Sequence, residues 1–564
     1  MTKSRLSHLG AGVAGAAAII TVLTLAARLV GFGRWFAQNA WIGPNEVGAA
    51  YSTANTVPNV LFEVAAGGAL AGAVIPLLAA PIAAHLRKDV DRSASALLTW
   101  AVVVLAPVAA LTWLLAPAIV ELLLDGSRAT DPAQVDLAST LLRMFAIQIP
   151  LYGVGVVLTG VLQAHRRFVA PALAPLLSSL VVLGSYYAFG LLAPTDPAPG
   201  ELTRAAVAWL GWGTTAGVVV LSLPLLIPVA RAGVRLRPTL HFPDGVARRA
   251  RALALAGMGT LVAQQISVLV AVRLANQYGD SNGTINVHQY AQAVVLLPYA
   301  VLAVPLATAM FPRLAHFAAT GRRQDLARES ATSTRVILVV AAVGAGVLVA
   351  VARPVEAVFA AFARGGVVDG MAGAMTASAA SVIGLALVFH LSRVLYALER
   401  ARLAVAAASV GWVAVAVVSI ATVLITVPAG GDGPTTLRAL GLGTSVGTLI
   451  GAGALLYGVR RSLGGEAISG VPQTGVVAII GAVLGALAGR GLETLFPSGG
   501  VAATIGYAVI VALVASLITL AVVLVGDRAS LLALRRSRGS SASSTEGAGI
   551  DGPIDVDENE GQQR

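Results

Sequence analysis

Five arginines lie inside long apolar stretches of this 564-residue sequence: Arg28, Arg34, Arg143, Arg273 and Arg393. A charged side chain at the centre of a bilayer costs roughly 3 kcal/mol, so such residues usually face water or an opposite charge. A guanidinium group pairs with phosphate oxygens through two parallel hydrogen bonds. If Arg28, Arg34 and Arg273 converge on one cavity, they suit an anionic group such as a diphosphate; packing between helices is the alternative. Arg143 and Arg393 lie near segment ends, where interface anchoring explains them.

The second apolar stretch adds an amide and a carboxylate, Asn59 and Glu63. A buried carboxylate near guanidinium groups predicts an ion pair, which either holds an arginine while the site is empty or is purely structural. On an ideal helix Arg28 and Arg34 are about 120° apart and do not share a face. The glycines at 31 and 33 would have to break the helix to re-aim Arg34; otherwise Arg34 snorkels to the outer interface.

Other chemistry is sparse. His390 lies alone in an apolar stretch, where it is either a proton carrier or a hydrogen-bonded packing residue. The sequence has no cysteine and no Walker loop, so we expect no disulfide, no thiolate metal site and no ATP-driven pump. No nucleophile is paired with a base, so we expect a protein that is not an enzyme, without metal or cofactor. Coupling to an ion or to the membrane potential stays open.

The elements that must position these residues are membrane-spanning helices. The chain is 57% hydrophobic and 12% charged, with a mean hydropathy of +0.82. About 20 apolar residues cross a hydrocarbon core of about 30 Å. This criterion predicts an all-α polytopic protein with fourteen segments: 13–42, 47–84, 94–124, 135–162, 168–193, 204–231, 250–277, 287–318, 331–352, 371–397, 402–428, 436–461, 473–495 and 500–526.

Positive charge is distributed unequally between the two sides of these segments. Of the 38 Lys and Arg residues, 27 fall at the termini or in every second gap, 6 in the remaining gaps and 5 inside segments. Cytoplasmic loops carry this excess, so both termini are predicted to be cytoplasmic. The net charge of +11 is then explained by anionic lipid headgroups, with no nucleic-acid partner.

The chain also repeats itself in parallel. Residues 70–79 share six identities in ten with 306–315, and 161–166 resembles 394–400, at offsets of 236 and 233. Six helices separate the repeats, so two six-helix lobes share one orientation, as in many transporters. We therefore expect an N-lobe (1–231), a cytoplasmic linker (232–249), a C-lobe (250–461), two added helices (462–526), and a disordered tail (527–564) that is Ser/Gly-rich and then acidic.

Several motifs together resemble those of the MurJ/MviN lipid II flippase family. Residues 27–34, Ala-Arg-Leu-Val-Gly-Phe-Gly-Arg, are similar to its S-R-x-x-G-F-x-R opening. Pro58-Asn59 through Gly67-Gly68 to Pro76 resembles its next motif, and Arg167-Phe168 to Pro175 resembles its R-F-x-x-P-A-x-A-P. The sequence departs from the family pattern at Trp35, Phe62, Gly67, Ala49 and Gln292-Ala293.

The resemblance implies the multidrug/oligosaccharidyl-lipid/polysaccharide exporter fold in a bacterial cytoplasmic membrane. It implies a polyprenyl diphosphate-linked sugar, lipid II, as substrate, moved to the outer leaflet by alternating access, with membrane lipids around it. The departures keep two alternatives open: an exporter of another undecaprenyl-linked glycan or of small cations, and a non-transporting scaffold that recruits cell-wall synthesis proteins through its tail.

Overall fold

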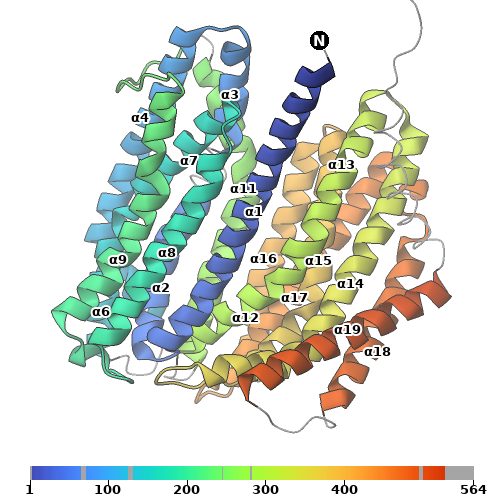
Figure 1. Cartoon of the computed structure of the whole chain (residues 1–564). Coiled ribbons are helices and arrows are strands. Elements are labelled where there is room, and N and C mark those ends of the chain that lie inside the picture. Colours follow the sequence, from blue (N-terminus) through green and yellow to red (C-terminus); the bar gives the residue numbers. More distant parts are fainter. Residues whose placement is uncertain are drawn as a thin grey trace, which may run out of the picture.

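Each of the fourteen predicted segments corresponds to helix in the computed structural model, which describes residues 3–64, 71–124, 131–243, 246–279, 283–493 and 500–527 (Figure 1). The described residues contain no strand, and twelve helices are long and apolar enough to cross a membrane. The first two predicted segments correspond to α1 and to the pair α2 and α3. The prediction of an all-α polytopic membrane protein is confirmed, and the number fourteen is approximate.

The N-lobe contains the helices α1 (Lys3–Trp41), α2 (Glu46–Phe62), α3 (Ala71–Ala83), α4 (Arg87–Leu114), α5 (Ala116–Leu124), α6 (Pro132–Ala146), α7 (Gln148–Ala164), α8 (Val169–Leu192), η2 (Pro199–Glu201), α9 (Arg204–Ser222), η3 (Leu223–Leu225) and α10 (Leu226–Arg231). The C-lobe contains α11 (Val246–Tyr278), α12 (Thr284–Pro298), the π-helix η4 (Tyr299–Ala303), α13 (Val304–Ala319), α14 (Arg323–Ala361), α15 (Met371–Ala397), α16 (Ala401–Thr426) and α17 (Gly433–Leu463). After η5 (Gly465–Ile468) come the added helices α18 (Val471–Glu493) and α19 (Val501–Gly526).

Prolines explain where predicted segments are broken into shorter helices. A proline removes one backbone donor and its ring clashes with the carbonyl four residues earlier. Pro117 follows the break between α4 and α5, Pro150 follows the break between α6 and α7, and Pro224 lies in the 3-10 turn η3. The π-helix η4 lies between Pro298 and Pro305. These breaks let one membrane segment change direction without leaving the lobe.

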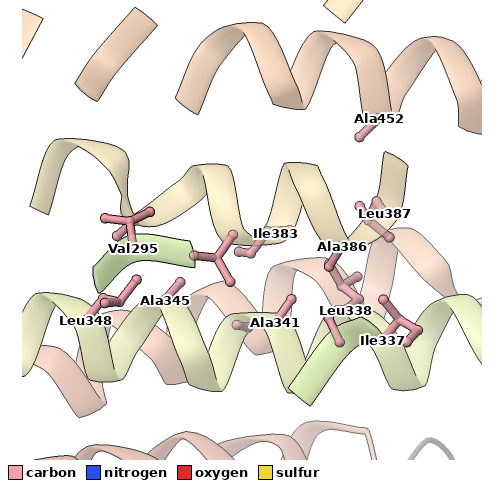
Figure 2. Packing of buried hydrophobic residues seen from close by; sticks show 14 of the residues in the cluster. Val295, Ile337, Leu338, Ala341, Ala345, Leu348, Ile383, Ala386, Leu387 and Ala452 are labelled. Atoms are coloured by element: carbon pink, nitrogen blue, oxygen red, sulfur yellow. The ribbon is translucent and has the colours of Figure 1, made fainter. Parts of the chain in front are cut away.

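Each lobe has its own apolar core. Val74, Leu158 and similar residues fill the N-lobe, and a larger cluster within residues 287–523 fills the C-lobe. Figure 2 shows the C-lobe core, where Ala341 and Ala345 of α14 and Ala386 of α15 lie between larger aliphatic side chains. Small residues at these positions let helix backbones approach closely, which is the usual basis of helix packing in a membrane.

Four matching turns repeat between the lobes at one end of the bundle. Residues His85, Arg166, Gly321 and Glu399 each adopt a left-handed conformation after α3, α7, α13 and α15, with φ of 55°, 57°, 69° and 59°. In each turn the next backbone N–H donates to a carbonyl five residues earlier, which is the Schellman pattern. Gly321 follows His85 by 236 residues and Glu399 follows Arg166 by 233, the offsets of the sequence repeat.

Of these four left-handed positions only position 321 has glycine, the residue that this conformation favours. A left-handed conformation costs a residue with a Cβ atom about 1 kcal/mol relative to glycine. We therefore expect Glu399→Gly to raise the thermal midpoint of the purified protein by about 1–2 °C, with no change in helicity. Gly321→Ala, the matched reverse substitution, is expected to lower it. Circular dichroism melts of both variants measure the effect, and equal shifts of the same sign would contradict it.

The added helices are tied to the C-lobe by a buried ion pair. Arg335 Nη2 of α14 lies 2.7 Å from Asp527 Oδ1, and Arg335 Nε donates to Thr474 Oγ1 of α18 at 3.0 Å. Thr474 also contacts the second oxygen of Asp527. Asp527 is the first residue of the predicted disordered tail, and it is ordered by this pair; residues 528–564 lie outside the described residues, as do Gly67 and Gly68.

Candidate functional site

The two lobes meet at the end of the bundle that carries the loops 42–45, 193–203 and 362–370, together with Gly279 and Gly283, here called the closed end. Figure 1 shows the bundles close together at this lower end and spread apart toward the N terminus, here called the open end. A cluster of buried apolar residues crosses between the lobes at the closed end, joining Ile42 and Val47 to Ala275, Ile285 and Leu440. Access between the lobes is therefore blocked at one end.

Arg364, in the loop after α14, contributes more hydrogen bonds to this closure than any other described side chain. Its Nη1 donates to the carbonyl oxygens of Gly190 (2.7 Å) and Trp41 (3.3 Å), and its Nη2 to those of Ala193 (2.8 Å) and Pro194 (3.1 Å). These acceptors include the unpaired carbonyls at the ends of α1 and α8. A cation is favourable there because the carbonyl end of a helix carries partial negative charge. One C-lobe side chain thus binds two N-lobe helix ends.

Three amide side chains, two of them buried and one half-buried, add further bonds across the closed end. Asn39 Nδ2 donates to the carbonyl oxygen of Phe359 at 2.6 Å, and Asn286 Nδ2 donates to that of Gly43 at 3.0 Å. Asn276 Nδ2 donates to Thr53 Oγ1 at 3.0 Å. Buried amides that lose such partners incur a desolvation cost of about 1–3 kcal/mol each, so these bonds favour closure over partial separation.

Glycine permits the closest backbone approach in this region. Gly283 has a φ of +73°, and a Cβ atom there would lie 2.5 Å from the carbonyl carbon of Pro44. At Gly366 a Cβ atom would lie 2.3 Å from the carbonyl oxygen of the same proline. The loop after α1 is therefore held between two C-lobe loops with no room for a side chain.

Two of the predicted arginines reach across the interface between the lobes. Arg28 of α1 donates from Nη1 to the carbonyl oxygen of Ala300 in the π-helix η4, at 3.2 Å, and remains exposed. Arg273 of α11 donates from Nη1 to the carbonyl oxygen of Leu122 in α5. α1 and α11 are the first long helices of the two lobes. Each lobe therefore donates one guanidinium group to a backbone carbonyl of the other. Neither group pairs with a carboxylate within the described residues.

Arg34 forms no ion pair in the part of the chain that the structure describes. Two buried tyrosines of the N-lobe, Tyr51 and Tyr186, are hydrogen-bonded to each other at 2.8 Å. α1 is continuous from Lys3 to Trp41, so the two glycines between Arg28 and Arg34 do not break it. The two side chains therefore leave α1 on different sides, as an unbroken helix requires.

Asn59 and Glu63 lie at the end of α2, where the predicted ion pair is not formed. Asn59 Oδ1 accepts a hydrogen bond from Tyr152 at 3.2 Å, and its Nδ2 donates to the carbonyl oxygen of Asn55 at 2.8 Å. Glu63 is exposed and follows the last residue of α2. It lies within 4.0 Å of no arginine in the part of the chain that the structure describes, because Arg28 and Arg273 are turned to carbonyl groups instead.

Carboxylates gather at the rim of the closed end. Burial raises the pKa of Glu46, the first residue of α2, and the nearby charges of Asp131 and Asp196 raise it further. A raised carboxyl pKa means that the closed arrangement favours the protonated form. The Glu46 carboxyl therefore makes its full contribution to the stability of the closed end below pH 4.5, its ordinary pKa. This contribution decreases as the pH rises from there through the raised pKa.

Sequence reasoning missed the residues that close the interface. In the charge pattern Arg364 is only a loop residue on the less basic side, and nothing in that pattern distinguishes the amides Asn39, Asn276 and Asn286. A signal was available, because each of these amides lies within a few residues of the end of an apolar segment. His390, by contrast, is buried and bonded to Ser333 at 3.0 Å, which is the packing alternative.

Two helical lobes, joined at one end and with arginines between them, define a two-lobed polytopic membrane protein. The fold is similar to a solved structure described as "Lipid II flippase MurJ, inward closed conformation" (TM-score 0.69, 17% identity, covering 90% of this chain and 98% of that one). It is also similar to an inward-facing multidrug resistance MATE family transporter (TM-score 0.62, 16% identity, 79% and 98%).

The family model described as "Lipid II flippase MurJ" matches residues 39–525, and the chain belongs to this family. A relative from Rhizobium meliloti, "Probable lipid II flippase MurJ", is 26% identical over 59% of this chain and 60% of its own length. A "Lipid II flippase MurJ" from Burkholderia cenocepacia is 27% identical over 53% and 56%. The chain thus spans about 60% of the length of the curated relatives it matches. It is a multi-pass membrane protein of a bacterial transporter family.

Proposed function

We propose that this chain is a flippase that moves lipid II, the lipid-linked peptidoglycan precursor, from the inner to the outer leaflet by alternating access. The observation that carries the proposal is the pair of arginines at the interface: Arg28 and Arg273 each bind a carbonyl of the opposite lobe, and neither has a carboxylate partner among the described residues. Family membership supplies the substrate class. A diphosphate offers these guanidinium groups stronger, charge-assisted acceptors than neutral carbonyls.

The geometry of closure supports alternating access. The excess of arginine in every second gap supports a cytoplasmic position for both termini and for the open end. The closed end then faces outward, and the molecule is ready to receive substrate from the inner leaflet of the cytoplasmic membrane. Diphosphate binding would release Arg28 from Ala300 and Arg273 from Leu122, which frees the lobes to separate at the closed end.

We propose that transport proceeds without catalysis or a cofactor, and membership of a flippase family supports this. The uneven charge on the two sides is compatible with a contribution of the membrane potential, which is worth about 2.3 kcal/mol per charge per 100 mV. Glu63 is proposed to pair with a released arginine at a later step rather than in the closed arrangement.

The experiment that tests the function is rescue of a strain depleted of its resident lipid II flippase. We expect the wild-type chain to restore growth and to expose lipid II at the outer leaflet. If another undecaprenyl-linked glycan is exposed at the outer leaflet and lipid II is not, that glycan is the substrate instead of lipid II. Normal membrane levels without any exposed lipid-linked sugar would favour the scaffold alternative, in which deletion of 539–564 abolishes function.

A further inference from the structure

The segment after α10 does not behave as a free linker. Residues 234–242, here called the strap, run in extended conformation along the first turns of α4. Val234 is buried in the N-lobe core, and Leu236 and Phe242 pack against it. The intervening residues Arg235 and Arg237 are exposed. This alternation is that of a strand with one buried face, so both arginines point away from the N-lobe.

Three side chains of α4 fix the strap through its backbone. Asp91 Oδ1 accepts from the N–H of Arg235 at 2.9 Å, and Ser95 Oγ accepts from the N–H of Arg237 at 3.0 Å. Thr99 Oγ1 accepts from the N–H of Thr239 at 3.1 Å. Four residues of helix rise about 6 Å and two residues of strand about 6.6 Å, so the two repeats stay in step. The arginine side chains remain free of these bonds.

The strap lies on a side of α4 that also faces lipid. Trp100 is 42% exposed, and its Nε1 donates to the carbonyl oxygen of Leu240 at 3.0 Å. Val102, Val103 and Val104 follow it and are all exposed. A tryptophan at the start of an exposed apolar face is typical of the boundary between headgroups and acyl chains. The backbone of Arg237 is bonded to Ser95, which lies about one helical turn before Trp100 on α4. Arg237 is therefore near the level of the headgroups.

Further basic residues lie on this surface, and no ion pair within the described residues neutralises them. Arg87, Lys88 and Arg92 are also exposed there, and Arg92 Nε donates to the carbonyl oxygen of His241 at 3.3 Å. None of these residues, nor Arg235 or Arg237, forms an ion pair in the described part of the chain. The carboxylate of Asp91 is engaged by the strap backbone.

We propose that the strap and the start of α4 form a binding surface for the headgroup of an anionic phospholipid. Arg235 and Arg237 would bind its phosphate from the strap, and Trp100 would mark the depth at which the acyl chains begin. Each basic residue near a membrane surface strengthens binding about fivefold. The surface is separate from the interface between the lobes, so it concerns the surrounding bilayer rather than the transported lipid.

The test is native mass spectrometry of the full chain titrated with phosphatidylglycerol or phosphatidylcholine. We expect Arg235→Gln with Arg237→Gln to weaken binding of the first phosphatidylglycerol on the order of twentyfold and to leave phosphatidylcholine unchanged. The matched control is Arg460→Gln with Arg461→Gln, two exposed arginines at the end of α17. Replacement of Arg235 and Arg237 by lysine keeps the charge and is expected to retain most of the binding.

A third variant separates an ordered surface from charge alone. Ser95→Ala with Thr99→Val removes two anchors of the strap and no charge, and we expect it to weaken phosphatidylglycerol binding severalfold. Equal losses in the strap pair and the control pair would overturn the proposal, because bulk charge would then explain both. Unchanged binding in the strap pair, or in the anchor variant, would also overturn it. Transport of the lipid-linked sugar is measured separately and does not enter this comparison.

Discussion

Replacement of Arg28 by alanine is expected to abolish rescue of a flippase-depleted strain while the protein reaches the membrane at normal levels. The guanidinium group is exposed between the lobes and its one bond in the structure is to the Ala300 carbonyl. A hydrogen bond to a charged group is worth about 1.5–3 kcal/mol. Loss of two such bonds to a diphosphate would lower affinity by more than about a hundredfold.

Arg28→Lys provides the matched comparison, because it keeps the charge and loses the planar fork. We expect it to retain partial rescue. Outer-leaflet exposure of lipid II and binding of lipid II to the purified chain are the two measurements. Full rescue by Arg28→Ala would show that Arg28 does not hold the substrate, and the Arg28–Ala300 contact would then be structural.

Replacement of Arg364 by alanine is expected to open the closed end. The side chain donates to four carbonyl oxygens of the N-lobe, and at least one charge-assisted bond of about 1.5 kcal/mol is lost outright. The population open at this end should therefore rise at least about tenfold. The chain contains no cysteine, so a single Ala50→Cys substitution reports access to a buried position at this end without removing one of its hydrogen bonds.

The readout is the rate at which an impermeant maleimide labels that cysteine in whole cells. Arg438→Ala is the matched control, because Arg438 is exposed near the start of α17 and forms no ion pair in the described residues. We expect the control to label as slowly as the parent. Equal rates in both variants would mean that the apolar cluster and the amides close the interface without Arg364.

The helices could be predicted from the sequence because apolar length is a local property. The repeat was also visible, since the turns at His85, Arg166, Gly321 and Glu399 end the same helices that the matching segments identify. α14 was predicted as 331–352 and spans Arg323–Ala361. The flanking residues, with Asp325, Arg328 and Arg353, are too polar for an apolar criterion, although they continue the same helix.

The positions of the predicted site residues can be compared with the structure, whereas their role in substrate binding stays a prediction. Arg28 and Arg273 do lie at the interface between the lobes, but their partners are backbone carbonyls, and backbone acceptors leave no mark in a sequence. Glu63 was paired with arginine on charge alone, which ignores the competing carbonyls. The sequence predicts only a linker where the strap lies. The four-residue spacing of Asp91, Ser95 and Thr99 matches the two-residue spacing of the strap N–H groups, and this match is visible only when both segments lie side by side.

Because α14 is long, a small tilt of this helix displaces its two ends by a large distance. Its 39 residues extend about 58 Å, roughly twice the hydrocarbon thickness of about 30 Å. A tilt of about 20° about its midpoint would displace each end by about 10 Å, given the helical rise of 1.5 Å per residue. Arg335 ties α18 and α19 to this helix, so they would swing with it. A spin label at its open-end terminus would therefore report motions that are small at the level of the arginines.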